Sequence, residues 1–207
     1  MSRIAMRAER QVEKILYKEA SKLKLRSVKL ADCEIGERNG VGHLISTSLL
    51  GGRTTVDRLR TYRFHMGDRP VIYICPFAGA LFHPPEIHAV VEGTPSRTTV
   101  FDGKGWHGDD SLQHNAEVRL ALKGFRWTLR SQALFNLKWG LQICPLDNNR
   151  SHLVMQAGTY GFWTPSFGLS KFVQVAKAVE GALSPGASER APFRYPCFSD
   201  HALSLLQ

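Results

Sequence analysis

Residues 3–24 repeat with the period of an amphipathic α-helix. Placed at about 100° per residue, five cations fall within a stripe roughly 80° wide, namely Arg3, Arg7, Arg10, Lys14 and Lys18. The opposite side is apolar and consists of Ala5, Ala8, Val12, Ile15, Leu16 and Leu23. No Gly or Pro occurs between residues 1 and 35. The pattern predicts a helix over 3–24 with one apolar and one basic face.

The following part of the chain alternates with period two, which is typical of β-strands. Turns rich in Gly, Pro, Asp and Asn separate the candidate strands. These strands cover residues 27–35, 43–50, 54–66, 71–75, 87–92, 97–101 and 152–160. The segment VIYIC, residues 71–75, does not alternate, and we expect it to be buried on both faces.

The clearest alternation lies within residues 118–143. From Phe135 to Ile143, apolar residues alternate with polar or small ones, which predicts a half-buried strand. Residues 118–130 alternate in the same way, with a change of phase at Gly124 that indicates a β-bulge or bend. A helix is the alternative for 118–130, because its Arg and Lys residues also fall three and four apart. We favour strands, since the alternation continues beyond them and aromatic residues are frequent.

The strand interpretation creates a second basic surface. The cations that would share one sheet face are Arg119, Lys123, Arg126, Arg130 and Lys138. Such a face can contact phosphates without reading bases. The competing interpretation is ordinary solvent exposure, in which Lys and Arg also protect sheet edges from aggregation.

The C-terminal part predicts a second helix and a tail. Thr164 and Pro165 suit a helix N-terminus, and an apolar stripe follows at Leu169, Phe172, Val173, Ala176, Val179 and Leu183. From residue 184 the chain is rich in Pro, Ser and Ala, which predicts a flexible tail over 184–207. Its last residues, HALSLLQ, could dock on the body. The sequence therefore predicts a mainly β (α+β) protein. A basic helix (1–24) precedes a β-rich domain (25–183) of sandwich or jelly-roll type that ends in a helix.

Charge narrows the choice of partner. The 207 residues include 27 Lys and Arg against 18 Asp and Glu, a net charge of +9. The first thirty residues hold nine basic and three acidic side chains, and so carry +6 of this surplus. Such a surplus favours nucleic acid or an acidic membrane surface as partner. The apolar face of the first helix lacks Trp and Phe, which favours nucleic acid. The alternative is that the lysines only keep a surface helix solvated.

Several classes of protein are disfavoured. Four cysteines are not at metal-ligand spacing, which indicates reduced thiols in a cytosol-like compartment; they are Cys33, Cys75, Cys144 and Cys197. No apolar run approaches the ~18 residues of a membrane span, and the N-terminus lacks the apolar segment of a secretory signal. Phosphate-binding loops, dinucleotide fingerprints and nucleophile motifs are absent from the sequence. We therefore expect no cofactor, and we favour a binding protein over an enzyme.

Two clusters contain residue types that ligate metals. One comprises His107, Asp109, Asp110, His114 and Glu117. Such a set could hold a divalent ion that activates water. The spacing matches no motif with a mechanical basis, however, and the local sequence is typical of a turn, so we expect no metal site here. The other cluster comprises His83, Glu86 and His88. Two prolines keep this segment extended, so we do not expect its side chains to converge.

The order of parts resembles that of small RNA-virus coat proteins, in which a basic N-terminal segment precedes about eight strands without a catalytic set. The resemblance covers the layout of the whole chain and carries over no individual residue. It implies a β-sandwich shell protein that packages RNA, self-associates, and resides in the virion or the host cytoplasm. The alternatives are a regulatory DNA-binding protein of the kind that phages and plasmids carry, and a metal-dependent nuclease or phosphohydrolase using the His107–Glu117 cluster.

Overall fold

The structure is a computed structural model. It describes residues 3–29, 33–34, 45–47, 53–55, 58–78, 81–82, 86–102, 105–123, 140–156, 169–186 and 198–207. The fold that these residues form is mixed α+β, in which strands outnumber helices.

Ten strands form one antiparallel sheet, in the order β1-β5-β6-β8-β12-β11-β9-β10, with β2 beside β5 and β7 beside β6. Their bounds are β1 (Arg26–Lys29), β2 (Cys33–Glu34), β5 (Arg58–Met66), β6 (Arg69–Ala78), β7 (Leu81–Phe82), β8 (Glu86–Glu92), β9 (Thr99–Asp102), β10 (Gly105–His107), β11 (Leu141–Pro145) and β12 (Arg150–Gln156). Two further strands, β3 (Ile45–Thr47) and β4 (Arg53–Thr55), pair only with each other. Each strand segment expected between 27 and 101 and at 152–160 is confirmed in its described part; residues 157–160 lie outside the described residues.

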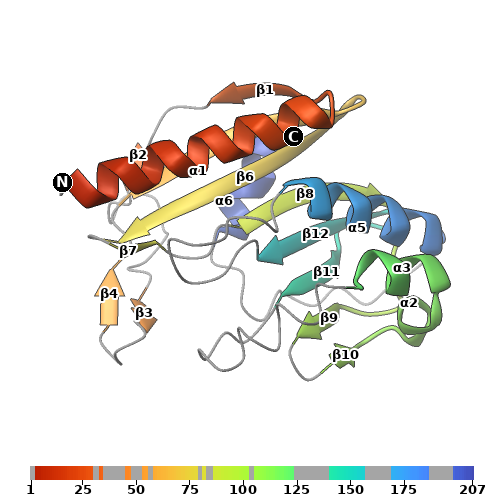
Figure 1. Ribbon diagram of the computed structural model, residues 1–207. Coiled ribbons are helices and arrows are strands. Elements are labelled where there is room, and N and C mark those ends of the chain that lie inside the picture. Colours follow the sequence, from red (N-terminus) through yellow and green to blue (C-terminus); the bar gives the residue numbers. More distant parts are fainter. Residues whose placement is uncertain are drawn as a thin grey trace.

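Helices cover both faces of the large sheet (Figure 1). On one face lie α1 (Arg3–Lys22) and α5 (Leu169–Ala182), together with the short α2 (Asp110–His114) and α3 (Ala116–Ala121) beside α5. On the other face lies α6 (Ser199–Leu206). Among the described residues no second large sheet packs against the first, so the sandwich or jelly-roll detail stays a prediction.

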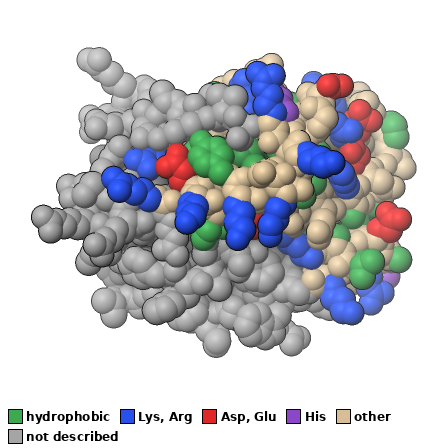
Figure 2. Space-filling model, turned by 45° about the horizontal axis from the view of Figure 1, so that its top comes forward, with side chains coloured by type: hydrophobic (Ala, Val, Ile, Leu, Met, Phe, Trp, Pro, Cys, Tyr) green, Lys and Arg blue, Asp and Glu red, His purple; other side chains and the backbone are tan. Residues whose placement is uncertain are grey.

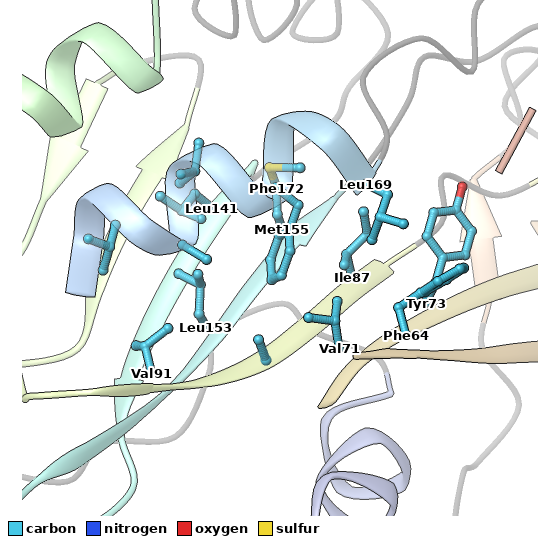
Figure 3. Close-up of a cluster of buried hydrophobic side chains, with 14 of the residues drawn as sticks. Phe64, Val71, Tyr73, Ile87, Val91, Leu141, Leu153, Met155, Leu169 and Phe172 are labelled. Carbon is cyan, nitrogen blue, oxygen red and sulfur yellow. The ribbon is translucent and has the colours of Figure 1, made fainter. Parts of the chain in front are cut away.

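The main core fills the space between the sheet and α5. Figure 3 shows Phe172 and Leu169 of α5 facing Ile87, Met155 and other side chains of the central strands. All the apolar residues predicted for the stripe of this helix are buried except Leu183, which packs at the edge of the core. The helix over 164–183 is confirmed for Leu169–Ala182. Residues 164 and 165 lie outside the described part of the chain.

The segment VIYIC is buried on both faces, as predicted. Val71 and Tyr73 belong to the core under α1 and α5, whereas Ile72 and Ile74 contact α6 on the reverse face. Since side chains alternate along a strand, only a strand with both faces covered can bury five successive residues. This segment of β6 lies in the interior of the sheet, between β5 and β8.

The same double burial corrects the prediction for residues 134–143. The described end of this segment is strand β11, but Gln142 is as fully buried as its neighbours Leu141 and Ile143. The expected solvent-exposed face is therefore wrong for these residues. Period-two alternation shows that two faces differ in polarity and does not show that the polar face meets water. Residues 134–139 lie outside the described residues.

The strand predicted over 118–130 is wrong for residues 118–123, where the helical alternative holds; residues 124–130 lie outside the described residues. Residues Ala116–Ala121 form α3, whose N-cap is Asn115. Val118 and Leu122, one helical turn apart, are buried, while Leu120 is 68% exposed. A strand would have placed all three on one face; the helix buries two of them against the main core. Gly124, where a bulge was predicted, lies outside the described residues.

Both ends of the chain pack on the body. The basic helix predicted over 3–24 is present as α1, and its Leu16 and Ala20 are buried in the main core, so it is not a detached arm. The tail predicted as flexible contains α6, whose Ala202 and Leu206 are buried against Ile72 and Ile74. The flexible-tail prediction is thus wrong for Ser199–Leu206, and the docking considered for HALSLLQ occurs.

Candidate nucleic-acid interface

The orientation of α1 follows from the two residues that are buried among its described side chains. Leu16 and Ala20 lie four apart and enter the core, so the opposite side of the helix must face solvent. That side carries Arg10, Lys14 and Lys18, and all three are exposed. We call these three side chains the basic stripe. Arg3 and Arg7 lie on the same line of α1, but the structure describes only their backbone.

The two described acidic side chains of α1, Glu13 and Glu19, face away from the basic stripe. Burial, followed by the negative charge of Glu13, raises the pKa of Tyr17, and both also raise the pKa of Tyr62. The Glu13 carboxylate therefore lies near this aromatic pair, which connects α1 to the sheet with a ring separation of 6.0 Å. The Glu19 carboxylate accepts a hydrogen bond from the backbone N–H of Ser170 at 3.5 Å. Both carboxylates are thus turned towards the body of the protein.

The described side chains around the basic stripe consequently do not neutralise it. Within the described residues, no ion pair involves Arg10, Lys14 or Lys18. Figure 2 shows a row of Lys and Arg side chains along this helix, with the acidic side chain set to one side of the row. Like charges one helical turn apart repel one another. Their spacing along the axis is about 6 Å, so the stripe is a linear array of cations suited to a chain of phosphates.

The two described residues of the second predicted basic surface do not lie on a sheet. Arg119 lies on α3 and Lys123 just beyond it, and both are exposed. The prediction that they line a sheet is wrong, because this segment is helical. Arg126, Arg130 and Lys138 lie outside the described residues.

Two residues of the first candidate metal cluster have local structural roles. Asp109 caps α2 and accepts hydrogen bonds from Ser111 and from the backbone N–H of Ser96. Burial opposes ionisation of Asp109, but these hydrogen bonds outweigh it and lower the pKa. His114 donates from Nδ1 to the Asp110 carbonyl oxygen at 2.9 Å.

The described members of the two candidate clusters do not form a metal-binding group. Within the described ranges, no three or more His, Cys, Asp or Glu side chains are arranged to hold a metal ion. This covers His107, Asp109, Asp110, His114 and Glu117, which therefore do not converge on an ion. His83 of the other cluster lies outside the described residues.

Glu86 and His88 do come together, in a buried network that the sequence did not reveal. Nε2 of His88 lies 3.1 Å from the Glu86 carboxylate, and Nδ1 of His88 lies 3.2 Å from Nε2 of His152. The backbone N–H of Phe198, at the start of α6, donates to the same carboxylate at 3.3 Å. Glu86, His88 and His152 are all at least 97% buried. Burial, and secondarily the charge of His88, lowers the pKa of His152 to about 3.

This network joins α6 to the sheet and does not contact solvent. Its signal in the sequence is weak, because His88 and His152 lie on strands far apart in the chain. They become neighbours only through the pairing of β8 with β12. Their burial argues for a structural role in the state described.

Comparisons with protein-family models, with curated proteins and with solved structures give no match to this chain. Among the helices described, none combines the length and apolar character that crossing a lipid bilayer requires. The functional argument therefore rests on the residues themselves.

Proposed function

We propose that this protein binds nucleic acid by contacting phosphates along the basic stripe of α1. The observation that carries the proposal is the outward position of Arg10, Lys14 and Lys18 on a helix whose described carboxylates face the body. Lys and Arg side chains neutralise phosphates and release counterions, which drives association irrespective of base sequence. RNA is favoured over DNA by the resemblance in layout to RNA-virus coat proteins.

The salt dependence of binding tests this proposal. Three to four phosphate contacts predict a slope of log affinity against log salt of about −2 to −3 for a single strand. Affinity should then fall roughly twenty- to fiftyfold between 50 and 200 mM salt. Fluorescence anisotropy of a labelled single-stranded RNA measures both quantities.

Matched double variants locate the contact. Lys14→Gln with Lys18→Gln should make the slope shallower by about 1.4. Arg97→Gln with Lys177→Gln removes the same charge from exposed positions outside α1 and should leave the slope unchanged. Equal losses in both pairs, or an affinity that does not respond to salt, would contradict the proposal.

The finer form of the proposal is packaging by many copies, as in a coat-type protein with a sandwich or jelly-roll shell. Size-exclusion chromatography with and without RNA, at two salt concentrations, tests it. Packaging gives large complexes that protect any RNA from nuclease. A small complex that prefers one DNA site by a factor of ~10³ or more would instead indicate a regulator. Chelator-sensitive cleavage of the strand would indicate an enzyme.

A further inference from the structure

A pocket of about 640 Å³ lies between the β9–β10 hairpin and the α2–α3 pair. Among its described lining residues are Phe101 and Trp106 on the hairpin, and His114, Arg119 and Lys123 on the helical side. None of the described lining residues belongs to α1. The pocket is therefore a surface distinct from the basic stripe.

The hairpin supplies an aromatic wall. Trp106 pairs with Phe101 across β10 and β9, so both side chains lie on the same face. Their ring centroids are 5.0 Å apart, with the planes tilted by 43°. Phe101 is buried and supports Trp106, which is only partly buried. The indole thus presents a supported aromatic surface to the pocket.

The helical side supplies positive charge. Val118 and Leu122 fix α3 in the core, which turns Arg119 and Lys123 outward. The nearby Glu117 carboxylate lies on the α5 side, 4.0 Å from the position of a Cβ built on Gly181. The described lining therefore combines two cations and one imidazole with no carboxylate.

The apolar part of the lining extends to the rim. Leu120, the most exposed large apolar side chain among the described residues, lies there. An exposed leucine beside a tryptophan and two cations matches a ligand that is flat and aromatic on one side and anionic on the other. A nucleotide has this combination, since every base has a π-face and carries a phosphate through its sugar.

We propose that this pocket binds one nucleotide of a single-stranded nucleic acid. The base lies against Trp106, and the phosphate contacts Arg119 and Lys123. The inference rests on the proposed function and deepens it, because it makes the ligand single-stranded. Bases stacked within a duplex are not available to an aromatic side chain in this way.

Two strands of equal charge test the stacking. Anisotropy at one fixed salt concentration compares a labelled oligothymidylate with an abasic phosphodiester of the same length. The wild-type protein should bind the base-bearing strand about tenfold or more tightly. Trp106→Leu should lose this preference and keep its affinity for the abasic strand, while Trp106→Phe should retain part of the preference. Arg119→Gln should weaken binding to both strands, whereas Lys177→Gln should weaken neither.

A free nucleotide separates this inference from the proposed function. Thymidine monophosphate titrated into the full chain and followed by NMR should shift the indole N–H resonance that Trp106→Phe removes. This readout uses the wild-type fold, so it holds even where Trp106→Leu does not fold. No strand preference and no shift would overturn the inference, while the salt slope of the α1 variants would stand on its own. A shift without salt-dependent strand binding would support the pocket and refute the α1 proposal.

Discussion

Acid should destabilise this protein through the buried imidazole of His152. The pKa of His152 falls from 6.5 in the unfolded chain to about 3 in the fold. Between these values the unfolded state binds the proton and the folded state does not, so stability is complete above pH 6.5 and decreases as pH falls. The decrease from this one group is on the order of 2 kcal/mol between pH 6.5 and pH 4.5.

Urea denaturation followed by circular dichroism at pH 7.5, 6.5, 5.5 and 4.5 measures this loss. A loss of this size is a large part of the 5–15 kcal/mol that is typical of a domain. His152→Gln keeps a side chain that can donate to His88 but cannot titrate, so its stability should depend less steeply on pH. The readout is the difference in slope between wild type and variant, which does not depend on the variant's stability at pH 7.5.

Other titrating groups are separated by the same comparison. Burial, then the charge of His88, also lowers the pKa of His201, which adds a loss of the same sign. His201 is present in both proteins, so its contribution cancels in the difference. The lowered pKa of Asp109 places its loss below pH 4, outside the window. Identical slopes for wild type and His152→Gln from pH 6.5 to 4.5 would refute the argument.

Two substitutions test how local structure positions the functional surfaces. Asn115→Ala removes the N-cap side chain that accepts hydrogen bonds from the backbone N–H groups of Glu117 and Val118. Thermal or urea unfolding should show a loss of stability of about 1 kcal/mol, whereas Asn115→Asp should stay close to wild type. An equal loss in both variants would contradict the capping role. Gly93→Ala would place a Cβ 2.5 Å from that of Leu183 at a φ of +84°, whereas Gly67→Ala at +62° meets nothing within 4 Å. Gly67→Ala should lower the free energy of unfolding by roughly 1–2 kcal/mol through backbone strain alone, and Gly93→Ala should lower it clearly more. Similar losses at the two positions would show that Leu183 does not pack closely against Gly93.

The elements that were predicted correctly are those in which the hydrophobic pattern matches the burial of each face. In α5, and in the described part of α1 from Arg10 onward, the polar side faces water and apolar residues face the core, as helical periodicity predicted. In VIYIC the lack of alternation signalled two covered faces, and α6 provides the second cover. Where a pattern is compatible with only one structure, the sequence is sufficient to predict the element and its buried faces.

The wrong predictions arose where the pattern permits two structures or depends on distant partners. Val118, Leu120 and Leu122 are spaced as in a strand, yet Val118 and Leu122 also lie one helical turn apart. The Asn115 cap and the packing of these two residues on the core stabilise the helix. Gln142 is polar but buried, because the reverse face of the sheet is covered there. No local pattern carries that information.

In the candidate sites, too, features that depend on local periodicity were predicted, and features that depend on tertiary packing were not. The basic stripe follows from the local periodicity of α1 and was predicted. The contact of His88 with His152, and the placement of Trp106 beside Arg119, depend on tertiary packing and were not. The pocket could have been found from sequence only with knowledge that residues 116–121 are helical.

The pairing of β8 with β12 has a consequence for how the protein reaches its native state. Strands β5, β6 and β8 follow closely along the chain and pair in that order, so a meander of these three can form early. The next strand across, β12, brings together residues 64 apart, as in the contact of His88 with His152. Long-range pairing of this kind slows folding, because the intervening loop must close before any contact forms. We expect the pairing of β12 with β8 to limit the rate of refolding. Helix α5 would then pack on the sheet after that strand has paired.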